Sequence, residues 1–321
     1  MLAIACPGQG SQTPGFLSPW LELPGVREHL EQLSDRAGTD LIRHGTVSDE
    51  ESIKDTAVAQ PLIVAAGLVT ARLLLQDHPL TAATVVAGHS VGELTASAVA
   101  GALSEDDAVA FVRVRANAMA QAAAALPTGM SAVLGGDPDD VAAVLADLGL
   151  TAANANGGGQ VVAAGTLEQL AALTDAPPAK ARVIPLKVAG AFHTAHMAPA
   201  VTALEALRPD LTPTDPLATL VSNYDGRPVA AGEGNLDSLI AQVSRPVRWD
   251  LCMESMQAMG VTGMVELSPA GTLTGLAKRG MRGTAALAVK SPEDLDAARS
   301  FISEHSRTSD LDPSLTSEGP Q

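Results

Sequence analysis

The sequence has few aromatic residues and few cysteines. Aromatic residues make up only 2% of the 321 residues, so a hydrophobic core must be built from aliphatic side chains and methionine. Cys6 and Cys252 are its two cysteines, which excludes a disulfide framework and a cysteine zinc site. A reduced compartment fits this usage, and we expect a cytoplasmic protein.

Positive charge and long apolar runs are also scarce. The chain carries 20 Lys and Arg against 36 Asp and Glu, a net charge of −16 at pH 7, which argues against nucleic acid and anionic membranes as partners. The longest apolar run, Leu62 to Leu75, contains Thr70 and Arg72, so we expect it to be too short and too interrupted to span a bilayer. The segment Met1 to Cys6 lacks the basic region of a signal peptide.

The remaining composition permits a large folded core. Hydrophobic residues make up 46% of the chain and charged residues 17%, so global disorder is excluded. Strand and helix patterns alternate, which predicts an α/β fold with a parallel sheet, similar to the α/β-hydrolase core. We expect core strands at Leu2 to Cys6, Thr84 to Ala87, Thr219 to Ser222 and, as the last one, Gly263 to Leu267. We expect core helices at Trp20 to His44, Thr56 to Asp77, Val91 to Gly101, from Ser104 onward, Thr194 to Leu207, Leu236 to Val243, Val247 to Met259, Leu273 to Lys278 and Pro292 to His305.

A different pattern follows the helix break at Pro127 to Gly129. Residues 127–189 read as strand, helix, strand, strand, helix and strand, the order of a ferredoxin-like unit. We interpret it as a small subdomain inserted into a catalytic core that comprises residues 1–126 and 190–305. Residues 306–321 are rich in Ser, Thr, Asp and Pro, and we expect a disordered tail there.

The segment Gly88-His89-Ser90-Val91-Gly92 lies between a predicted strand and a predicted helix. Glycines on both sides of Ser90 permit the sharp turn that a nucleophilic serine needs at such a junction. The adjacent helix N-terminus favours negative charge, which suits a nucleophile that passes through an oxyanion. The competing interpretation is an ordinary strand–helix turn in which Ser90 is only a helix N-cap.

A serine nucleophile needs a base, and the candidates are His89, His193 and His196, of which His193 is preferred. It follows a Gly-Ala-Phe turn at the start of a predicted helix, whereas His89 lies on the strand and tends to point away from Ser90. No Asp or Glu occupies the usual hydrolase position of a triad acid, so a backbone or amide carbonyl is expected to orient the histidine.

Arg115 lies on the apolar face of a predicted helix. The apolar residues Ala108, Phe111, Val112 and Met119 share that face. Because an unpaired buried charge is costly, Arg115 needs an internal acid, a hydrated cavity, a surface-reaching side chain or an anionic ligand.

These motifs together resemble one enzyme family over Met1 to about Ile302. In order they are Pro7-Gly8-Gln9-Gly10-Ser11-Gln12, Gln60-Pro61, Gly88-His89-Ser90-Val91-Gly92-Glu93, Arg115 before Met119, Phe192-His193 and Pro246-Val247-Arg248-Trp249. The set resembles the malonyl-CoA:acyl carrier protein transacylases of type II fatty acid synthesis, and the acyltransferase domains of polyketide synthases are similar. Arg245 departs from the pattern, because relatives often have Asn there.

The resemblance implies a ping-pong reaction through a malonyl-Ser90 intermediate, with His193 as the base. It implies that the backbone N–H groups of Gln9 and Val91 form the oxyanion hole and that Arg115 binds the malonyl carboxylate. It also implies that a main-chain carbonyl near Arg248 orients His193. The pocket residues implied are Gln60, His89, Met119, Asn154 and Phe192, the last of which would crowd an α-methyl branch.

The same resemblance names the substrates and the partner. They are malonyl-CoA and holo-acyl carrier protein, with no metal and no bound cofactor, and we expect a monomer. An acidic carrier would need a basic surface, and Lys187, Lys278, Arg279 and Arg282 are the candidates, although each alone fits an ordinary solvated charge.

Three other functions remain open from the sequence. A serine hydrolase or thioesterase would use Ser90 and His193 but would not need Arg115. A non-catalytic docking module would need none of the three. A polyketide acyltransferase would use the same residues.

Overall fold

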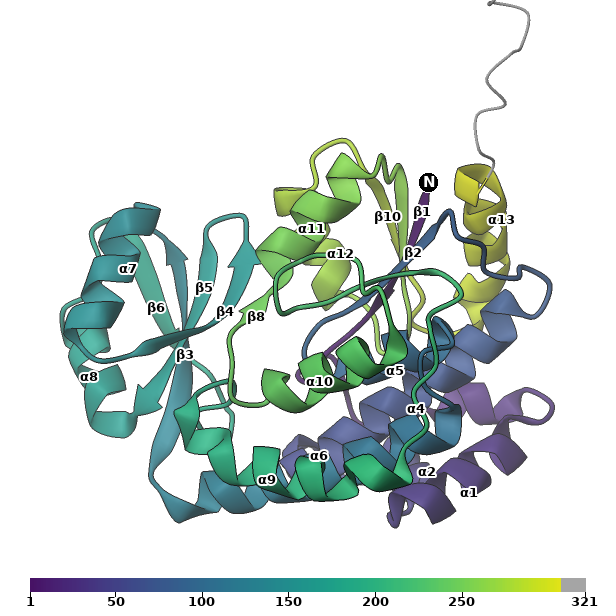
Figure 1. Ribbon diagram of the computed structural model, residues 1–321, viewed down its shortest axis with the longest axis horizontal. Coiled ribbons are helices and arrows are strands. Elements are labelled where there is room, and N and C mark those ends of the chain that lie inside the picture. Colours follow the sequence, from purple (N-terminus) through teal and green to yellow (C-terminus); the bar gives the residue numbers. More distant parts are fainter. Residues whose placement is uncertain (307–321) are drawn as a thin grey trace, which may run out of the picture.

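Two five-stranded sheets organise the chain over residues 1–306, which are the residues that this computed structural model describes (Figure 1). The last described element is helix α13 (Leu295–Ser306). We expected the disordered tail to begin at Ser306, but Ser306 is the last residue of this helix. The other residues of the predicted tail, 307–321, lie outside the described part of the chain.

The first sheet is parallel throughout. Its order is β10-β9-β1-β2-β7, with every neighbouring pair parallel. The strands are β1 (Leu2–Cys6), β2 (Thr84–Gly88), β7 (Thr219–Val221), β9 (Gly263–Glu266) and β10 (Ala285–Ala288). Parallel strands need helical crossovers, which cover both faces of the sheet. The prediction of an α/β fold with a parallel sheet is confirmed.

Alternate residues of β1 face two separate hydrophobic clusters. Leu2, Ile4 and Cys6 pack into the larger cluster, whereas Ala3 and Ala5 pack into the smaller one. This alternation follows from the two-residue period of a strand. The larger cluster includes residues of α1 (Val26–Ala37), α4 (Thr56–Leu75), α5 (Gly92–Val99), α6 (Glu105–Ala125), α9 (Ala198–Leu207), α10 (Gly232–Gln242) and α13. The smaller cluster includes residues of α11 (Trp249–Ala258) and α12 (Thr272–Gly280).

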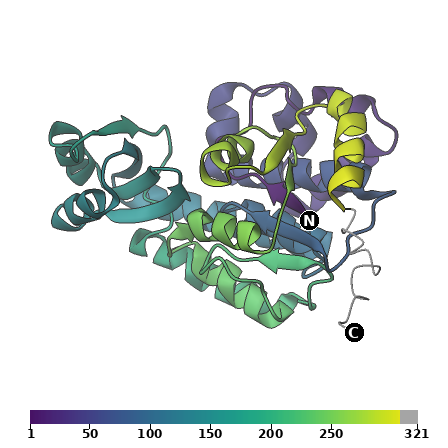
Figure 2. The same cartoon turned by 90° about the horizontal axis from the view of Figure 1, so that it is seen from above.

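The second sheet forms a subdomain that projects to one side of the core in both views (Figures 1 and 2). Its strands are β3 (Thr128–Gly135), β4 (Thr151–Gly157), β5 (Gln160–Thr166) and β6 (Ala181–Pro185), with helices α7 (Pro138–Asp147) and α8 (Leu167–Asp175). The antiparallel order β6-β3-β5-β4 is that of a ferredoxin-like unit. The exact domain boundaries stay a prediction.

A strand from the core segment extends this second sheet. β8 (Val247–Arg248) pairs in parallel with β4, so the sequence after Pro246 joins the subdomain to the core. The predicted helix from Val247 to Met259 is therefore wrong at its start, because α11 begins only at Trp249.

Other expected elements also differ from the structure, two of them in more than their ends. The predicted helix from Trp20 to His44 is split into a 3-10 turn (Ser18–Glu22), α1 and α2 (Leu41–Thr46), because Gly25 and Gly38 adopt left-handed conformations. A short helix, α3 (Glu50–Lys54), follows. Gly263 to Leu267 is not the last core strand, since β10 adds to β9 at the sheet edge.

Helix α4 is long and apolar enough to cross a membrane by length and composition. It has 20 residues, and an 18-residue stretch of it has a mean hydropathy of 1.8. The expectation that the run from Leu62 to Leu75 is too short and too interrupted to span a bilayer is therefore wrong for the helix as a whole, because the apolar stretch extends beyond that run. However, 78% of that apolar stretch is buried inside the fold, against α5 and α6, as in the core helix of a globular domain. The feature is weak evidence for a membrane span.

Candidate active site

The structure places Ser90 at the junction of β2 and α5 in a left-handed conformation, with φ of 54°. A Cβ atom on Gly88 would lie 2.1 Å from the backbone of Gly92, and one on Gly92 would lie 2.2 Å from the Cys6 carbonyl oxygen. Only glycine fits at either position. Asn223 holds the turn, because its Oδ1 accepts a hydrogen bond from the Ser90 N–H at 2.8 Å. Such strain at a serine is typical of a nucleophile elbow.

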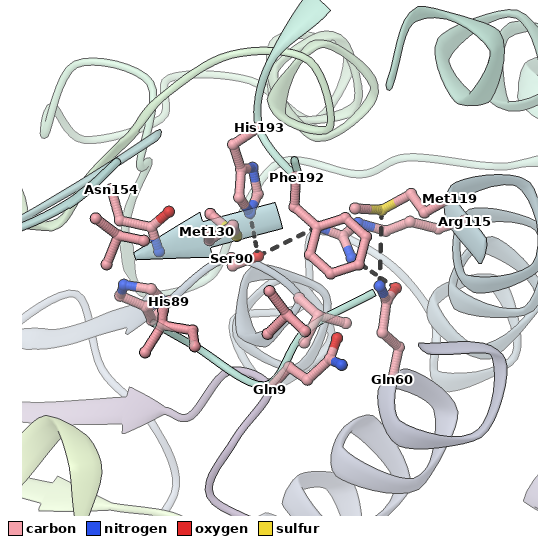
Figure 3. Close-up of a pocket in the computed structure, with 14 residues that line it drawn as sticks. Gln9, Gln60, His89, Ser90, Arg115, Met119, Met130, Asn154, Phe192 and His193 are labelled. Carbon is pink, nitrogen blue, oxygen red and sulfur yellow. Dashed lines mark hydrogen bonds between the residues drawn. The ribbon is translucent and has the colours of Figure 1, made fainter. Parts of the chain in front are cut away.

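His193 lies directly opposite the Ser90 hydroxyl. Its Nε2 is 2.7 Å from Ser90 Oγ (Figure 3). Its Nδ1 is 2.9 Å from the carbonyl oxygen of Gln242. Because a carbonyl only accepts hydrogen bonds, Nδ1 carries the proton and Nε2 is free to accept the serine proton. The pair therefore has the geometry of a nucleophile and its general base.

The prediction that a carbonyl near Arg248 orients His193 is wrong. Arg248 lies in β8, where its backbone pairs with β4 and its N–H donates to the Asn223 carbonyl at 2.9 Å. Gln242 is instead the last residue of α10, and the final carbonyls of a helix have no partner within the helix. His193 binds at that helix end through both its Nδ1 and its backbone N–H, which donates to the Val243 carbonyl at 3.1 Å.

His193 is neutral at ordinary pH. Burial lowers the pKa of His193 to about 3, and the nearby positive charge of Arg115 acts in the same direction. The imidazole is therefore available as a proton acceptor across the physiological range.

This lowered pKa predicts acid sensitivity of the folded state. The folded pKa lies below the unfolded value, so His193 opposes folding as the pH falls from about 6.5 towards 3, by up to about 1.4 kcal/mol per pH unit. We expect urea unfolding to show that wild-type protein loses more stability between pH 6.5 and 4.5 than His193→Gln. Equal losses in the two proteins would contradict a buried neutral His193.

Arg115 projects from α6 into the same cavity and is only 1% exposed. Its Nη1 donates to Gln60 Oε1 at 2.6 Å, and its Nη2 donates to Gln242 Oε1 at 2.8 Å and lies 3.3 Å from Ser90 Oγ. Burial lowers the pKa of Arg115 to about 10, which leaves it charged. Two neutral amides thus fix the guanidinium beside the serine, and its charge is free to bind an anion.

Two backbone N–H groups near Ser90 are unoccupied. Gln9 and Val91 line the cavity, and neither N–H donates a hydrogen bond to any protein acceptor within residues 1–306. Val91 is the residue after the serine, at the N-terminus of α5, and Gln9 follows β1. Both positions suit donors to an oxyanion on a carbonyl attacked by Ser90.

The other predicted pocket residues surround this cavity. Figure 3 shows them around Ser90: Gln60, His89, Met119, Asn154 and Phe192. His89 lies in the turn directly after β2 and flanks the cavity, and its Nε2 lies 2.8 Å from Asn156 Oδ1 in β4. A second, outer hollow shares five of the lining residues, namely Gln9, His89, Asn154, Val162 and Leu186. The cavity is therefore continuous with a path towards α12.

Sequence reasoning missed three residues that hold the site together. Gln242 and Asn223 carry no motif, and only the fold brings them to Ser90. Glu93 was visible, since it ends the Gly-His-Ser-Val-Gly-Glu segment and lies one turn after the serine on a buried helix. Burial raises the pKa of Glu93 to about 7, while hydrogen bonds from Asn223 and Gln242 act in the opposite direction.

Comparisons with known proteins agree with this geometry. The family model described as "Acyl transferase domain" matches residues 5–306. The malonyl CoA-acyl carrier protein transacylase of Mycobacterium tuberculosis (strain ATCC 25618 / H37Rv) is 53% identical over 297 residues, which cover 92% of this chain and 98% of that protein. The corresponding protein of Escherichia coli (strain K12) is 33% identical over 304 residues, covering 92% and 98%.

Solved structures of malonyl transacylases are also similar to this chain. The crystal structure of MCAT from Mycobacterium tuberculosis has a TM-score of 0.90 and 52% identity, over 93% of this chain and 99% of that one. The structure of a type II PKS acyl-carrier protein (holo) in complex with its malonyl-transacylase has a TM-score of 0.87 and 30% identity, over 93% of this chain and 99% of that one. The chain belongs to the acyl transferase domain family.

Proposed function

We propose that this chain transfers a malonyl group from malonyl-CoA to the phosphopantetheine thiol of acyl carrier protein, in fatty acid synthesis, and holds it on Ser90 between the two steps. One observation carries the proposal: the buried guanidinium of Arg115 lies 3.3 Å from the Ser90 hydroxyl. A nucleophile beside a fixed cation suits an acyl group that ends in a carboxylate. The named relatives are malonyl CoA-acyl carrier protein transacylases.

In the first step Ser90 Oγ attacks the thioester carbonyl carbon of malonyl-CoA. His193 Nε2 takes the hydroxyl proton, and the N–H groups of Gln9 and Val91 bind the oxyanion. The intermediate collapses, the carbon–sulfur bond breaks, and His193 returns the proton to the leaving sulfur. CoA leaves as the thiol, and malonyl-Ser90 remains.

Binding of the substrate carboxylate is expected to strengthen the base. The positive charge of Arg115 is one cause of the low pKa of His193. A carboxylate paired with that guanidinium offsets its charge, so the pKa of His193 rises when malonyl-CoA is bound. The base then gains proton affinity at the moment when Ser90 must be deprotonated.

In the second step a carrier thiol reaches Ser90 through the outer hollow. The Asn154 side chain lines both hollows, and its buried Oδ1 has no hydrogen-bond partner among the described residues. A pantetheine arm carries amide N–H groups that would satisfy this acceptor. The thiol attacks malonyl-Ser90 while His193 takes the thiol proton, and the proton then passes to the departing Ser90 oxygen.

A thioesterase is the competing function, and mass spectrometry separates the two. Mixing the protein with malonyl-CoA is expected to give a persistent malonyl adduct, which disappears when holo-acyl carrier protein is added and is recovered on the carrier. Rapid release of CoA and malonate with no adduct would overturn the transfer proposal.

Phe192 borders the cavity beside His193, where it would crowd an α-methyl branch on the acyl group.

Three further parts of the proposal concern the setting of the enzyme. We propose that it works in the cytoplasm, as a monomer and without a bound cofactor. Both cysteines are free and buried, which suits a reduced compartment. Every residue assigned a role above comes from a single chain, and each role requires only protein groups and the two substrates.

The carrier is proposed to dock beside the outer hollow. Lys187, Lys278, Arg279 and Arg282 are all exposed, and Arg279 and Leu186 line the hollow itself. Lys187 follows the lining residue Leu186, and Lys278 and Arg282 are close in sequence to the lining residue Arg279. In a protein with a net charge of −16, these positive charges would attract an acidic carrier to the hollow.

Charge reversal at this surface tests the docking site. We expect Lys187→Glu combined with Lys278→Glu to raise the KM for the carrier by about tenfold at low salt, because opposite charges at a rim promote encounter. Ser90 should still acquire malonyl. Arg27→Glu on α1 is a matched control, since Arg27 is exposed and lies outside this surface. An unchanged KM for the carrier would contradict the docking site.

A further inference from the structure

Glu93 lies beneath the serine turn, in the first turn of α5, and is 4% exposed. Its carboxylate does not contact any reacting group. Oε1 accepts the backbone N–H of Asn223 at 2.7 Å, and Oε2 accepts a hydrogen bond from Gln242 Nε2. Both oxygens therefore face donors, and each donor belongs to a residue that supports the site.

On one side, Glu93 fixes the residue that holds the serine turn. Asn223 donates its backbone N–H to Glu93, while its side chain accepts from the Ser90 N–H at 2.8 Å and donates to the Gly88 carbonyl at 2.7 Å. The carboxylate thus anchors Asn223 from behind the elbow.

On the other side, Glu93 determines which way the Gln242 amide points. Gln242 Nε2 donates to Glu93 and to the Ser90 carbonyl oxygen at 3.0 Å. The amide oxygen must then face Arg115, from which it accepts at 2.8 Å. Gln60 accepts from the other guanidinium nitrogen at 2.6 Å, so the two amide oxygens together hold the fork in place.

We propose that Glu93 is a positioning residue that selects carboxylate-bearing acyl groups, because it orients the Gln242 amide and thereby the Arg115 guanidinium. The inference rests on the proposed function, since it concerns how Arg115 recognises the malonyl carboxylate. In this proposal Glu93 does not contact the substrate, but it controls the orientation of the Arg115 guanidinium, which does.

An amide at position 93 would not replace the acid. The ionised carboxylate, which predominates above the Glu93 pKa of about 7, accepts at both oxygens, as the contacts here require. The side chain in Glu93→Gln accepts at only one end and donates at the other at every pH. One of the two donors, Asn223 N–H or Gln242 Nε2, then faces another donor. Asn223 N–H belongs to the backbone, so the Gln242 side chain is the one expected to rotate. The NH₂ group of Gln242 would then point at the Arg115 guanidinium. Both groups are hydrogen-bond donors, so the contact that holds Arg115 would be lost.

The test compares loading of Ser90 from malonyl-CoA and from acetyl-CoA, which lacks the carboxylate. We expect Glu93→Gln to lower the ratio of malonyl to acetyl loading rates by about tenfold, with the larger loss in the malonyl rate. The acetyl rate also reports that the variant is folded. Ser97→Ala is a matched control, because Ser97 is a buried polar residue one turn later on α5 that does not contact the Glu93 carboxylate. Its hydroxyl donates to the backbone carbonyl of Glu93 at 2.7 Å and accepts from Asn235 Nδ2 at 3.0 Å. Ser97→Ala should leave the ratio within about twofold of wild type.

The outcomes separate this inference from the function on which it rests. An equal fall in both rates, an unchanged ratio or a rising ratio in Glu93→Gln would each overturn it. If that variant fails to fold, Glu93→Asp keeps both acceptors but withdraws them by one methylene, and a lowered ratio is still expected, whereas an unchanged one overturns the inference. If Arg115→Ala leaves the ratio unchanged, the proposed function itself fails. If Arg115→Ala removes the preference and Glu93→Gln does not, only the role of Glu93 fails.

Discussion

Ser90→Ala is expected to abolish both the malonyl adduct and malonyl transfer to the carrier. The hydroxyl is the only group that lies 2.7 Å from His193 Nε2 within the described part of the chain, and it carries the acyl group in both proposed steps. Loss of a nucleophile in a comparable serine enzyme lowers kcat by about 10⁶-fold. Intact mass after mixing with malonyl-CoA measures the adduct, and carrier acylation measures transfer.

A serine far from the cavity serves as the control. Ser300 lies on α13, where its hydroxyl bonds to the Asp296 carbonyl, so Ser300→Ala should retain the adduct and the transfer rate. A malonyl adduct that persists in Ser90→Ala would place the acyl group on another residue and would contradict the proposed mechanism.

Arg115→Ala is expected to have the second largest effect, and a selective one. Losing the partner of a desolvated carboxylate costs about 2–5 kcal/mol, which corresponds to a fall of about 30-fold to 4000-fold in malonyl loading. Acetyl loading should fall much less, because acetyl has no carboxylate to bind. Arg115→Lys is not expected to restore malonyl loading, since an ammonium group cannot span Gln60 and Gln242 as the planar fork does.

Arg113 provides the matched control on the same helix. It is exposed and lies near Gly38 on the opposite side of α6, so Arg113→Ala should leave both loading rates near wild type. Equal losses of malonyl and acetyl loading in Arg115→Ala would mean that Arg115 only supports the fold.

Local patterns in the sequence predicted much of the fold and the main contacts. The Gly-flanked serine and the arginine on an apolar face are local features, because each depends on residues within a few positions along the chain. The structure brings both of them to one cavity with His193. The alternating strand and helix patterns likewise predicted the parallel sheet and the ferredoxin-like insertion.

The boundaries and the edge strands were harder to predict. β8 has two residues and β10 four, too short for a periodic signal, and each is stabilised by a neighbour distant in sequence. The predicted helix from Val247 failed for this reason, and the role assigned to Arg248 failed with it.

The partners that orient the catalytic groups were decided by the tertiary structure. Ser90 and His193 are 103 positions apart, and Gln242 lies a further 49 positions away from His193, yet one carbonyl and one amide of Gln242 contact both. Every residue has a backbone carbonyl, so the sequence does not show which carbonyl orients His193. The role of a buried amide likewise depends on which groups surround it in the fold. The sequence therefore indicated which groups are proposed to perform the chemistry, because their types and local spacing are chemically constrained. The fold alone specified what holds those groups in place, because hydrogen bonds between distant segments depend on position in space.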